Sequence, residues 1–105
     1  MTDISLHTPA PGLQRLVLQG PLTIYDASDL KTRLLDGLQD GQVIELDLAQ
    51  VPEIDTSGVQ LLLLLEREVQ RLGGRLHITA VSGAVREVLD FCRLGARFGL
   101  AQNGS

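Results

Sequence analysis

Short strand-like runs alternate with helix-like runs along most of this 105-residue chain, and this alternation limits what the chain can fold into. The helix-like runs have apolar residues three and four positions apart, whereas the strand-like runs are continuously apolar or alternate apolar with polar residues. In chain order the pattern reads strand, strand, helix, strand, helix, strand, helix. Parallel strands joined through helices need crossover connections, so we predict an α/β fold with a mostly parallel central sheet.

Turn residues separate the runs and set their limits. Pro9 and Gly12 lie between the first two strand-like runs, which predicts an opening hairpin, and Gly73 ends the second helix-like run. We expect four to five strands with helices packed on them, in one domain over residues 1–105 whose tail frays at about 102–105. The predicted strands are 4–7, 13–18, 43–48 and 75–81, and the predicted helices are 25–38, 59–72 and 83–93.

Composition argues against several classes of function. Nine Lys and Arg against thirteen Asp and Glu give a formal net charge of -4, without the basic surplus that nucleic-acid backbones attract, so we expect no nucleic-acid partner. The longest apolar stretch, residues 61–65, is far shorter than the roughly 20 residues of a membrane-spanning helix, so we expect no direct membrane insertion. The amino end lacks an export-signal pattern, and Cys92 has no second cysteine to pair with. These features predict a cytoplasmic protein.

Residues that could support catalysis or bind a metal are not arranged for either. His7 and His77 have no second His, Cys or carboxylate at a metal-ligand spacing on one helix face. Asp55 is close to Ser57, but no Gly-x-Ser-x-Gly sequence and no evident His partner accompany them. The sequence therefore predicts a protein that is not an enzyme, with no catalytic residue, no metal site and no cofactor.

The most informative segment is Asp55-Thr56-Ser57-Gly58, which leads directly into the second predicted helix. The first N–H groups of a helix lack intrahelical partners, and Asp, Thr and Ser side chains accept hydrogen bonds from them. One interpretation is therefore an ordinary helix N-cap, followed by a glycine that allows a tight turn or a close approach. The other is that a hydroxyl here accepts a phosphate, whose charge of about -1.5 to -2 would change the surface beside Asp55 while the fold persists.

The second predicted helix has more apolar residues than one core-facing side requires. At about 100° per residue, Val59 and Leu63 point away from the side that faces the sheet. Two exposed apolar residues one turn apart, next to a candidate switch, indicate a docking patch. The alternative is that the first and third helices cover this helix on more than one side. The residues expected to face the sheet are Leu61, Leu62, Leu65, Val69 and Leu72.

The chain resembles the STAS domains, small cytosolic proteins typified by bacterial anti-sigma factor antagonists. The resemblance extends over nearly the whole chain, and its most specific part is the element at 55–58 at a helix start. Gly20 before the loop into the first helix, the strand at 43–48 and the segment 67–74 followed by a strand also match. This resemblance implies a STAS-like fold.

The resemblance also implies a function, namely binding a protein partner in signal transduction and transcription regulation. The implied partner is an anti-sigma factor or serine/threonine kinase, which the unphosphorylated form binds through this loop and the following helix. In the family the phosphorylated residue is usually the hydroxyl residue directly after the Asp, which is Thr56 here, with Ser57 as the second candidate. The implied partner-binding residues are Asp55, Thr56, Ser57, Gly58, Val59, Gln60 and Leu63.

Two departures from the usual pattern leave other partners open. Many anti-sigma factor antagonists have an Asp in the loop before the first helix, where this chain has Thr23, with Asp26 three residues later. Thr56 in place of the commoner Ser is similar to the STAS subunits that dock on the ATPase of lipid-trafficking ABC transporters. A chemotaxis-associated STAS adaptor is a third possibility. The residues do not indicate an oligomeric state.

Overall fold

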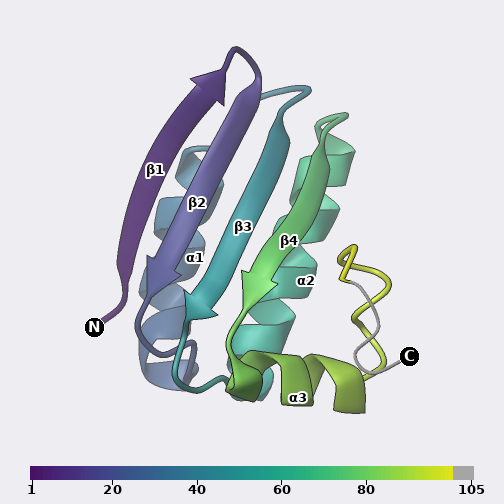
Figure 1. The fold of residues 1–105 in the computed structure, drawn as a ribbon. Coiled ribbons are helices and arrows are strands. Elements are labelled where there is room, and N and C mark those ends of the chain that lie inside the picture. Colours follow the sequence, from purple (N-terminus) through teal and green to yellow (C-terminus); the bar gives the residue numbers. More distant parts are fainter. Residues whose placement is uncertain (101–105) are drawn as a thin grey trace.

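Four strands form one sheet, in the order β1-β2-β3-β4, in the computed structural model, which describes residues 1–100. β1 (Asp3–Ala10) pairs antiparallel with β2 (Leu13–Gln19), which confirms the predicted hairpin. β3 (Val43–Gln50) pairs in parallel with both β2 and β4 (Arg75–Val81). The sheet is therefore mostly parallel, as predicted, and β1 and β4 form its two edges (Figure 1).

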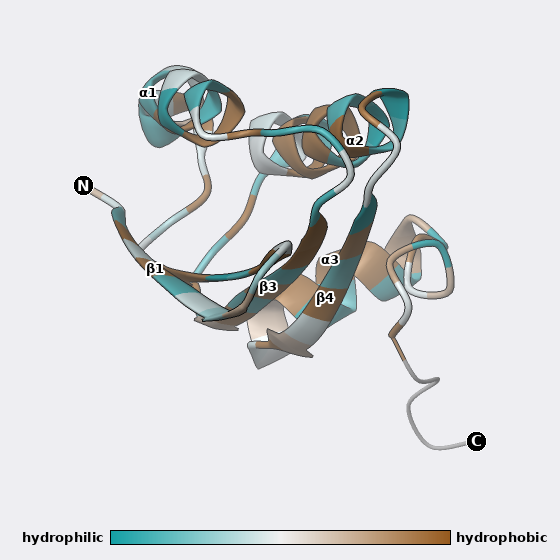
Figure 2. Ribbon diagram, turned by 90° about the horizontal axis from the view of Figure 1, so that it is seen from above, coloured by the Kyte–Doolittle hydropathy of each residue, from teal (hydrophilic) through white to brown (hydrophobic). Residues whose placement is uncertain are grey.

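Three helices alternate with the strands in the predicted order: α1 (Ile24–Asp36), α2 (Thr56–Arg71) and α3 (Gly83–Phe91). α1 and α2 lie side by side on one face of the sheet, and α3 crosses near the carboxyl end of β4 (Figures 1 and 2). The predicted α/β fold class is thereby confirmed. Among residues 1–100, no helix is both long and apolar enough to cross a membrane. The predicted frayed tail at 102–105 lies outside the described residues.

The core fills the space between the sheet and the two helices α1 and α2, where the hydrophobic segments of both layers face each other (Figure 2). In β3, buried apolar residues alternate with half-buried ones, as expected of a strand with one face in the core. Each such side chain stabilises the fold by about 1.5–3 kcal/mol when fully buried. The buried residues of the two inner strands and of α1 are Leu16, Leu18, Ile44, Leu46, Leu48, Leu30 and Leu34.

The segment after α3 returns along β4 and reaches α2. The Ile78 N–H donates to the Phe98 carbonyl oxygen over 3.1 Å, and the Phe98 side chain is fully buried. Arg97 Nε donates to Glu66 Oε1 over 2.5 Å, and Glu66 is only 2% exposed. One flank of α2 therefore packs beside α1, while the opposite flank meets the chain's last described residues.

This coverage corrects the predicted exposure of one residue on α2. Val59 is only 8% exposed, and Leu63 is half-buried and packs against the core. Both residues share a flank with Glu66, because positions four and seven apart lie on one side of a helix. The prediction that Val59 is exposed is wrong because α2 is covered on more than one side, and a helical wheel shows only the direction of a side chain.

Candidate functional site

The starts of α1 and α2 are held together because the segments that precede them pair with each other. Leu22 and Ile54 form an isolated parallel bridge. The Leu22 N–H donates to the Glu53 carbonyl oxygen over 3.0 Å, and the Asp55 N–H donates to the Leu22 carbonyl oxygen over 3.2 Å. These bonds place the Asp55-Thr56-Ser57-Gly58 element beside the first turn of α1.

A single carboxylate caps both helices. Asp55 is the N-cap of α2, and its Oδ1 accepts a hydrogen bond from the Gly58 N–H over 3.1 Å. Its Oδ2 accepts from the N–H of Ile24, the first residue of α1, over 2.9 Å. Thr23, the N-cap residue of α1, makes no capping bond with its own side chain. The N-cap interpretation is therefore confirmed, and the same side chain also serves the neighbouring helix.

The electrostatic consequence is a firmly ionised carboxylate. The hydrogen bond from the Ile24 N–H is the largest influence on Asp55 and lowers the pKa of its carboxyl, and the Gly58 N–H acts in the same direction against the opposing effect of burial. The positive ends of two helix dipoles also favour a negative charge at this point. Asp55 is therefore charged at neutral pH and is occupied in holding the two helices.

Gly58 is required by space. A Cβ at this position would collide with the Leu22 carbonyl oxygen and would lie 2.7 Å from Ile54 Cγ1 and 2.9 Å from Leu22 Cβ. The first turn of α2 therefore presses directly on the segment before α1, and only a residue without a side chain permits this approach. Gly58 is itself buried, and its lack of a side chain allows the two helix starts to lie this close together.

Both polar and apolar residues are exposed at this junction. Thr56, the first residue of α2, is exposed, and Ser57 is half-exposed. On α1, Ile24 is 65% exposed and Tyr25 is 93% exposed. Ile24 and Tyr25 are not among the site residues predicted from the sequence, although both precede the apolar positions that α1 turns toward the core.

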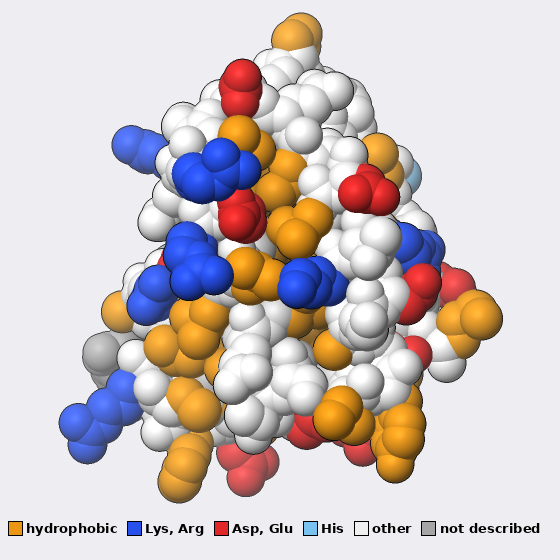
Figure 3. Space-filling model, turned by 180° about the vertical axis from the view of Figure 1, so that it is seen from behind, with side chains coloured by type: hydrophobic (Ala, Val, Ile, Leu, Met, Phe, Trp, Pro, Cys, Tyr) orange, Lys and Arg blue, Asp and Glu red, His pale blue; other side chains and the backbone are white. Residues whose placement is uncertain are grey.

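A shallow groove continues from this junction between the two helices. Gln60 and Leu64 follow Thr56 at intervals of four residues, and both line the groove from α2. Ala27 and Lys31 line it from α1. Figure 3 shows this side of the molecule, where hydrophobic side chains lie among basic and acidic ones. Leu64, which is half-buried like Leu63, is the outward apolar residue that α2 contributes to this groove.

Of the predicted site residues, Asp55, Thr56, Ser57, Gly58 and Gln60 lie together at the junction of α1 and α2. Val59 is buried, and Leu63 is half-buried and packs against the core. Within the described part of the chain, no group of three or more His, Cys, Asp or Glu side chains is placed to hold a metal ion. The residues that remain exposed at this junction are positioned by the two hydrogen bonds of Asp55 and by the close approach of the two helix starts at Gly58.

Comparison with known proteins assigns this arrangement to a family. The family model described as "Mlab, STAS domain" matches residues 8–100. An anti-sigma factor antagonist from Mycobacterium paratuberculosis has 16% sequence identity and a TM-score of 0.82, over 99% of this chain and 88% of that one. The sulfate transporter family protein from Wolinella succinogenes has 22% identity and a TM-score of 0.69, over 89% of this chain and 76% of that one.

Two structures of SpoIIAA, the Bacillus cell fate determinant and anti-sigma factor antagonist, also match over 96% of this chain. The unphosphorylated form has 23% identity and a TM-score of 0.74 with 90% of its chain covered, and the phosphorylated form has 21% and 0.68 with 93% covered. Structural likeness at these identities supports the fold, while the family match covers most of the chain's sequence. The fold, the capped helix junction and the family match lead to one assignment: this chain belongs to the STAS domain family.

Proposed function

We propose that this STAS domain is a regulatory protein-binding module of the anti-sigma factor antagonist type. STAS domains are generally non-enzymatic binding modules. Its contact surface is what we call the Thr56 surface, and the partner is an anti-sigma factor with serine/threonine kinase activity. The observation that supports this most is the Asp55 carboxylate, which bonds to both helix starts and so fixes the exposed Thr56 beside exposed apolar residues. The Thr56 surface consists of Ile24, Tyr25, Thr56, Ser57, Gln60 and Leu64.

This surface has the composition of a protein contact. Ile24 and Tyr25 provide apolar area that water otherwise covers, and aromatic residues are enriched where proteins bind one another. Gln60 and Ser57 supply hydrogen-bonding groups at its centre. Because Asp55 and Gly58 lie beneath this surface and fix its shape, binding requires little reordering of the backbone.

Phosphorylation at Thr56 is the proposed control. The hydroxyl is on an exposed residue at the first position of α2, where a phosphate would meet the positive end of the helix dipole and leave the fold intact. The added charge would lie next to the ionised Asp55, so a partner that packs apolar groups here would meet a strongly negative patch. Ser57 is half-exposed and remains the second candidate.

The test is binding of the purified chain to the anti-sigma factor kinase, measured by calorimetry. Thr56→Glu should weaken binding at least tenfold, or about 1.4 kcal/mol, whereas Thr56→Val, which keeps the shape without the hydroxyl, should bind within about threefold of the wild type. Ser5→Glu adds the same charge to an exposed residue of β1 and serves as the control. Equal binding by the wild type and both Thr56 variants would show that Thr56 lies outside the interface.

A second candidate partner is the ATPase of a lipid-trafficking ABC transporter, bound constitutively through the same surface. The observation that favours it is Thr23, which stands where many anti-sigma factor antagonists have an Asp and which makes no capping bond. Incubation with the kinase and ATP separates the two functions. Incorporation of one phosphate at Thr56, located by peptide mass spectrometry, supports the switch, whereas an unmodified chain that binds the ATPase supports the constitutive dock.

A further inference from the structure

One leucine of β1 faces the helix side of the sheet but remains largely uncovered. Leu6 pairs with Leu16, and Leu16 pairs with Leu46, so all three project from the same face. Leu16 and Leu46 are buried in the core, whereas Leu6 is 61% exposed. The edge strand therefore presents an inward-facing apolar side chain that α1 does not cover.

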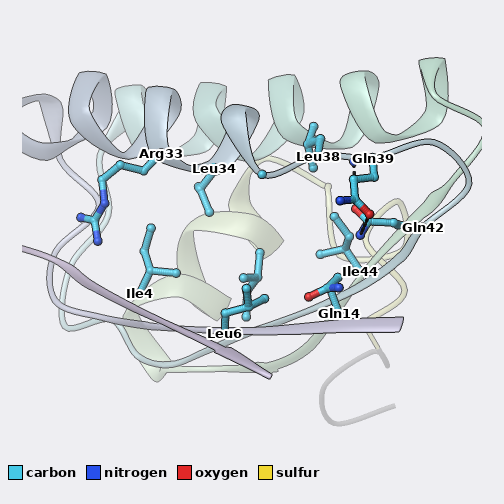
Figure 4. Close-up of a pocket in the computed structure, with 11 residues that line it drawn as sticks. Ile4, Leu6, Gln14, Arg33, Leu34, Leu38, Gln39, Gln42 and Ile44 are labelled. Atoms are coloured by element: carbon cyan, nitrogen blue, oxygen red, sulfur yellow. Dashed lines mark hydrogen bonds between the residues drawn. The ribbon is translucent and has the colours of Figure 1, made fainter. Parts of the chain in front are cut away.

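Beside Leu6, a hollow of about 230 Å³ lies between the sheet and the carboxyl-terminal half of α1 (Figure 4). Its middle is apolar and its two ends are polar, with Arg33 at one end and glutamine side chains at the other (Figure 4). By comparison with a dry cavity of about 150 Å³ that binds benzene, this space admits roughly nine carbon-sized atoms. Its apolar walls are Ile4, Leu6, Leu16, Leu34, Leu38 and Ile44.

The glutamine end contains a buried amide with unused donor capacity. Gln42 is only 6% exposed, and its Oε1 accepts from the Gln39 N–H over 3.0 Å. Among the described residues, its Nε2 contacts only Gln39 Oε1, over 3.5 Å, which is longer than an ordinary hydrogen bond. An amide nitrogen carries two N–H donors. This end of the hollow is therefore suited to a ligand atom that accepts a hydrogen bond.

The charges of the hollow indicate a neutral ligand. Of residues 1–100, Arg33 is the one charged residue that lines the hollow. Its Nη1 donates to Asp29 Oδ2 and to the Thr2 carbonyl oxygen, each over 3.3 Å. The Asp29 carboxylate therefore offsets the charge of the guanidinium at one end, and the glutamine end, on the opposite side of the hollow, carries no charge. A carboxylate placed at that end would lose its hydration without a cation to replace it, which is costly, whereas a carbonyl or amide loses much less.

We propose that this hollow, the Leu6 pocket, binds a small neutral amphipathic molecule. A short aliphatic chain covers Leu6 and fills the apolar middle, and a carbonyl or amide group accepts a hydrogen bond from Gln42. The pocket lies between α1 and the sheet, and it shares no lining residue with the groove between α1 and α2, so its occupation is a binding function separate from the proposed partner contact.

The experiment is a titration of the full chain with hexanamide, followed by NMR of the Leu34 and Ile44 methyl groups. Hexanamide should give saturable shifts, hexanoate should bind at least tenfold more weakly, and acetamide, which lacks the chain, should give no saturable shift. Absence of saturation with hexanamide, or tighter binding of hexanoate, would overturn the proposal.

Variants of one strand provide the matched controls. Leu6→Trp should fill the mouth of the pocket and weaken hexanamide binding at least tenfold, whereas Ser5→Trp, on the opposite face of the same strand, should bind like the wild type. Leu6→Lys is a second variant, for use if Leu6→Trp does not fold. It places a charge at an exposed position beside the pocket and should also weaken hexanamide binding at least tenfold. A wild-type dimer by sedimentation that Leu6→Lys converts to a monomer would show that a second copy covers Leu6, and would overturn the ligand assignment.

Discussion

Asp55 stabilises two helices, whereas a helix cap usually stabilises one. Its two carboxylate oxygens accept hydrogen bonds from the first turns of α1 and α2. Asp55→Ala should therefore destabilise the fold by about 2 kcal/mol, at the upper end for a lost cap. The stability of Asp55→Asn should lie between those of the wild type and Asp55→Ala. The amide oxygen can still accept a hydrogen bond from the Gly58 N–H, but the NH₂ group cannot accept one from the Ile24 N–H. Urea denaturation measures the free energy of unfolding of both variants. An equal loss of stability in Asp55→Ala and Asp55→Asn would contradict the assignment of one carboxylate oxygen to each helix.

The pH dependence of stability follows from the same two bonds. Because the Ile24 N–H lowers the pKa of the folded Asp55 carboxyl, the unfolded chain binds a proton there more readily than the folded chain. The contribution of Asp55 is complete above about pH 4, where the unfolded carboxyl is ionised, and it is lost as the pH falls through the lower folded pKa. The stability difference between the wild type and Asp55→Asn should therefore narrow below about pH 4, and a constant difference would argue against the assignment.

Gly58 and Gly83 make a matched pair of glycines in the first turns of helices. Gly58→Ala places a methyl group against the Leu22 carbonyl, so it should cost about 3 kcal/mol or prevent folding. Gly83→Ala meets nothing within 4 Å and should be neutral or stabilise by about 0.4–1 kcal/mol. Thermal unfolding of both variants checks this, and similar losses would mean that helix-start glycines matter here for backbone freedom alone.

At the scale of elements, an ion pair between Glu66 and Arg97 joins the flank of α2 that faces away from α1 to the segment after α3. The sequence alone does not predict this pair. Glu66 and Arg97 are far apart in the chain, and only the return of the last described residues along β4 brings them together. The Glu68–Arg71 pair, by contrast, lies within a single helix at a spacing of three and is predictable from sequence alone. Coverage of α2 therefore could not be deduced from its own periodicity.

This difference predicts unequal effects of two arginine substitutions. Arg97→Ala leaves the buried Glu66 carboxylate without its partner and should cost about 3 kcal/mol, whereas Arg71→Ala removes an exposed pair and should cost less than about 0.5 kcal/mol. Adding Glu66→Gln to Arg97→Ala should recover part of the loss. Chemical denaturation of the three variants provides the measurement, and equal single-variant losses would be inconsistent with a structural Glu66–Arg97 pair.

At the scale of the whole molecule, the sequence could predict the fold because strand and helix periods point to one core. Ile44, Leu46 and Leu48 recur every second residue and Leu30 and Leu34 every fourth, so the order of elements and the layers follow from local patterns. Only part of the candidate site could be predicted from the sequence. A cap at Asp55 is local, whereas the bond from Ile24 depends on how α1 and α2 pack, which local patterns do not encode.

The most direct measurement of the central claim is hydrogen–deuterium exchange of the intact chain with and without its purified kinase or ATPase partner. The account predicts slower exchange over residues 24–27 and 56–64, where the Thr56 surface lies, and unchanged exchange in β1 and α3. Protection confined to β1 or to α3, with residues 56–60 unaffected, would contradict the account.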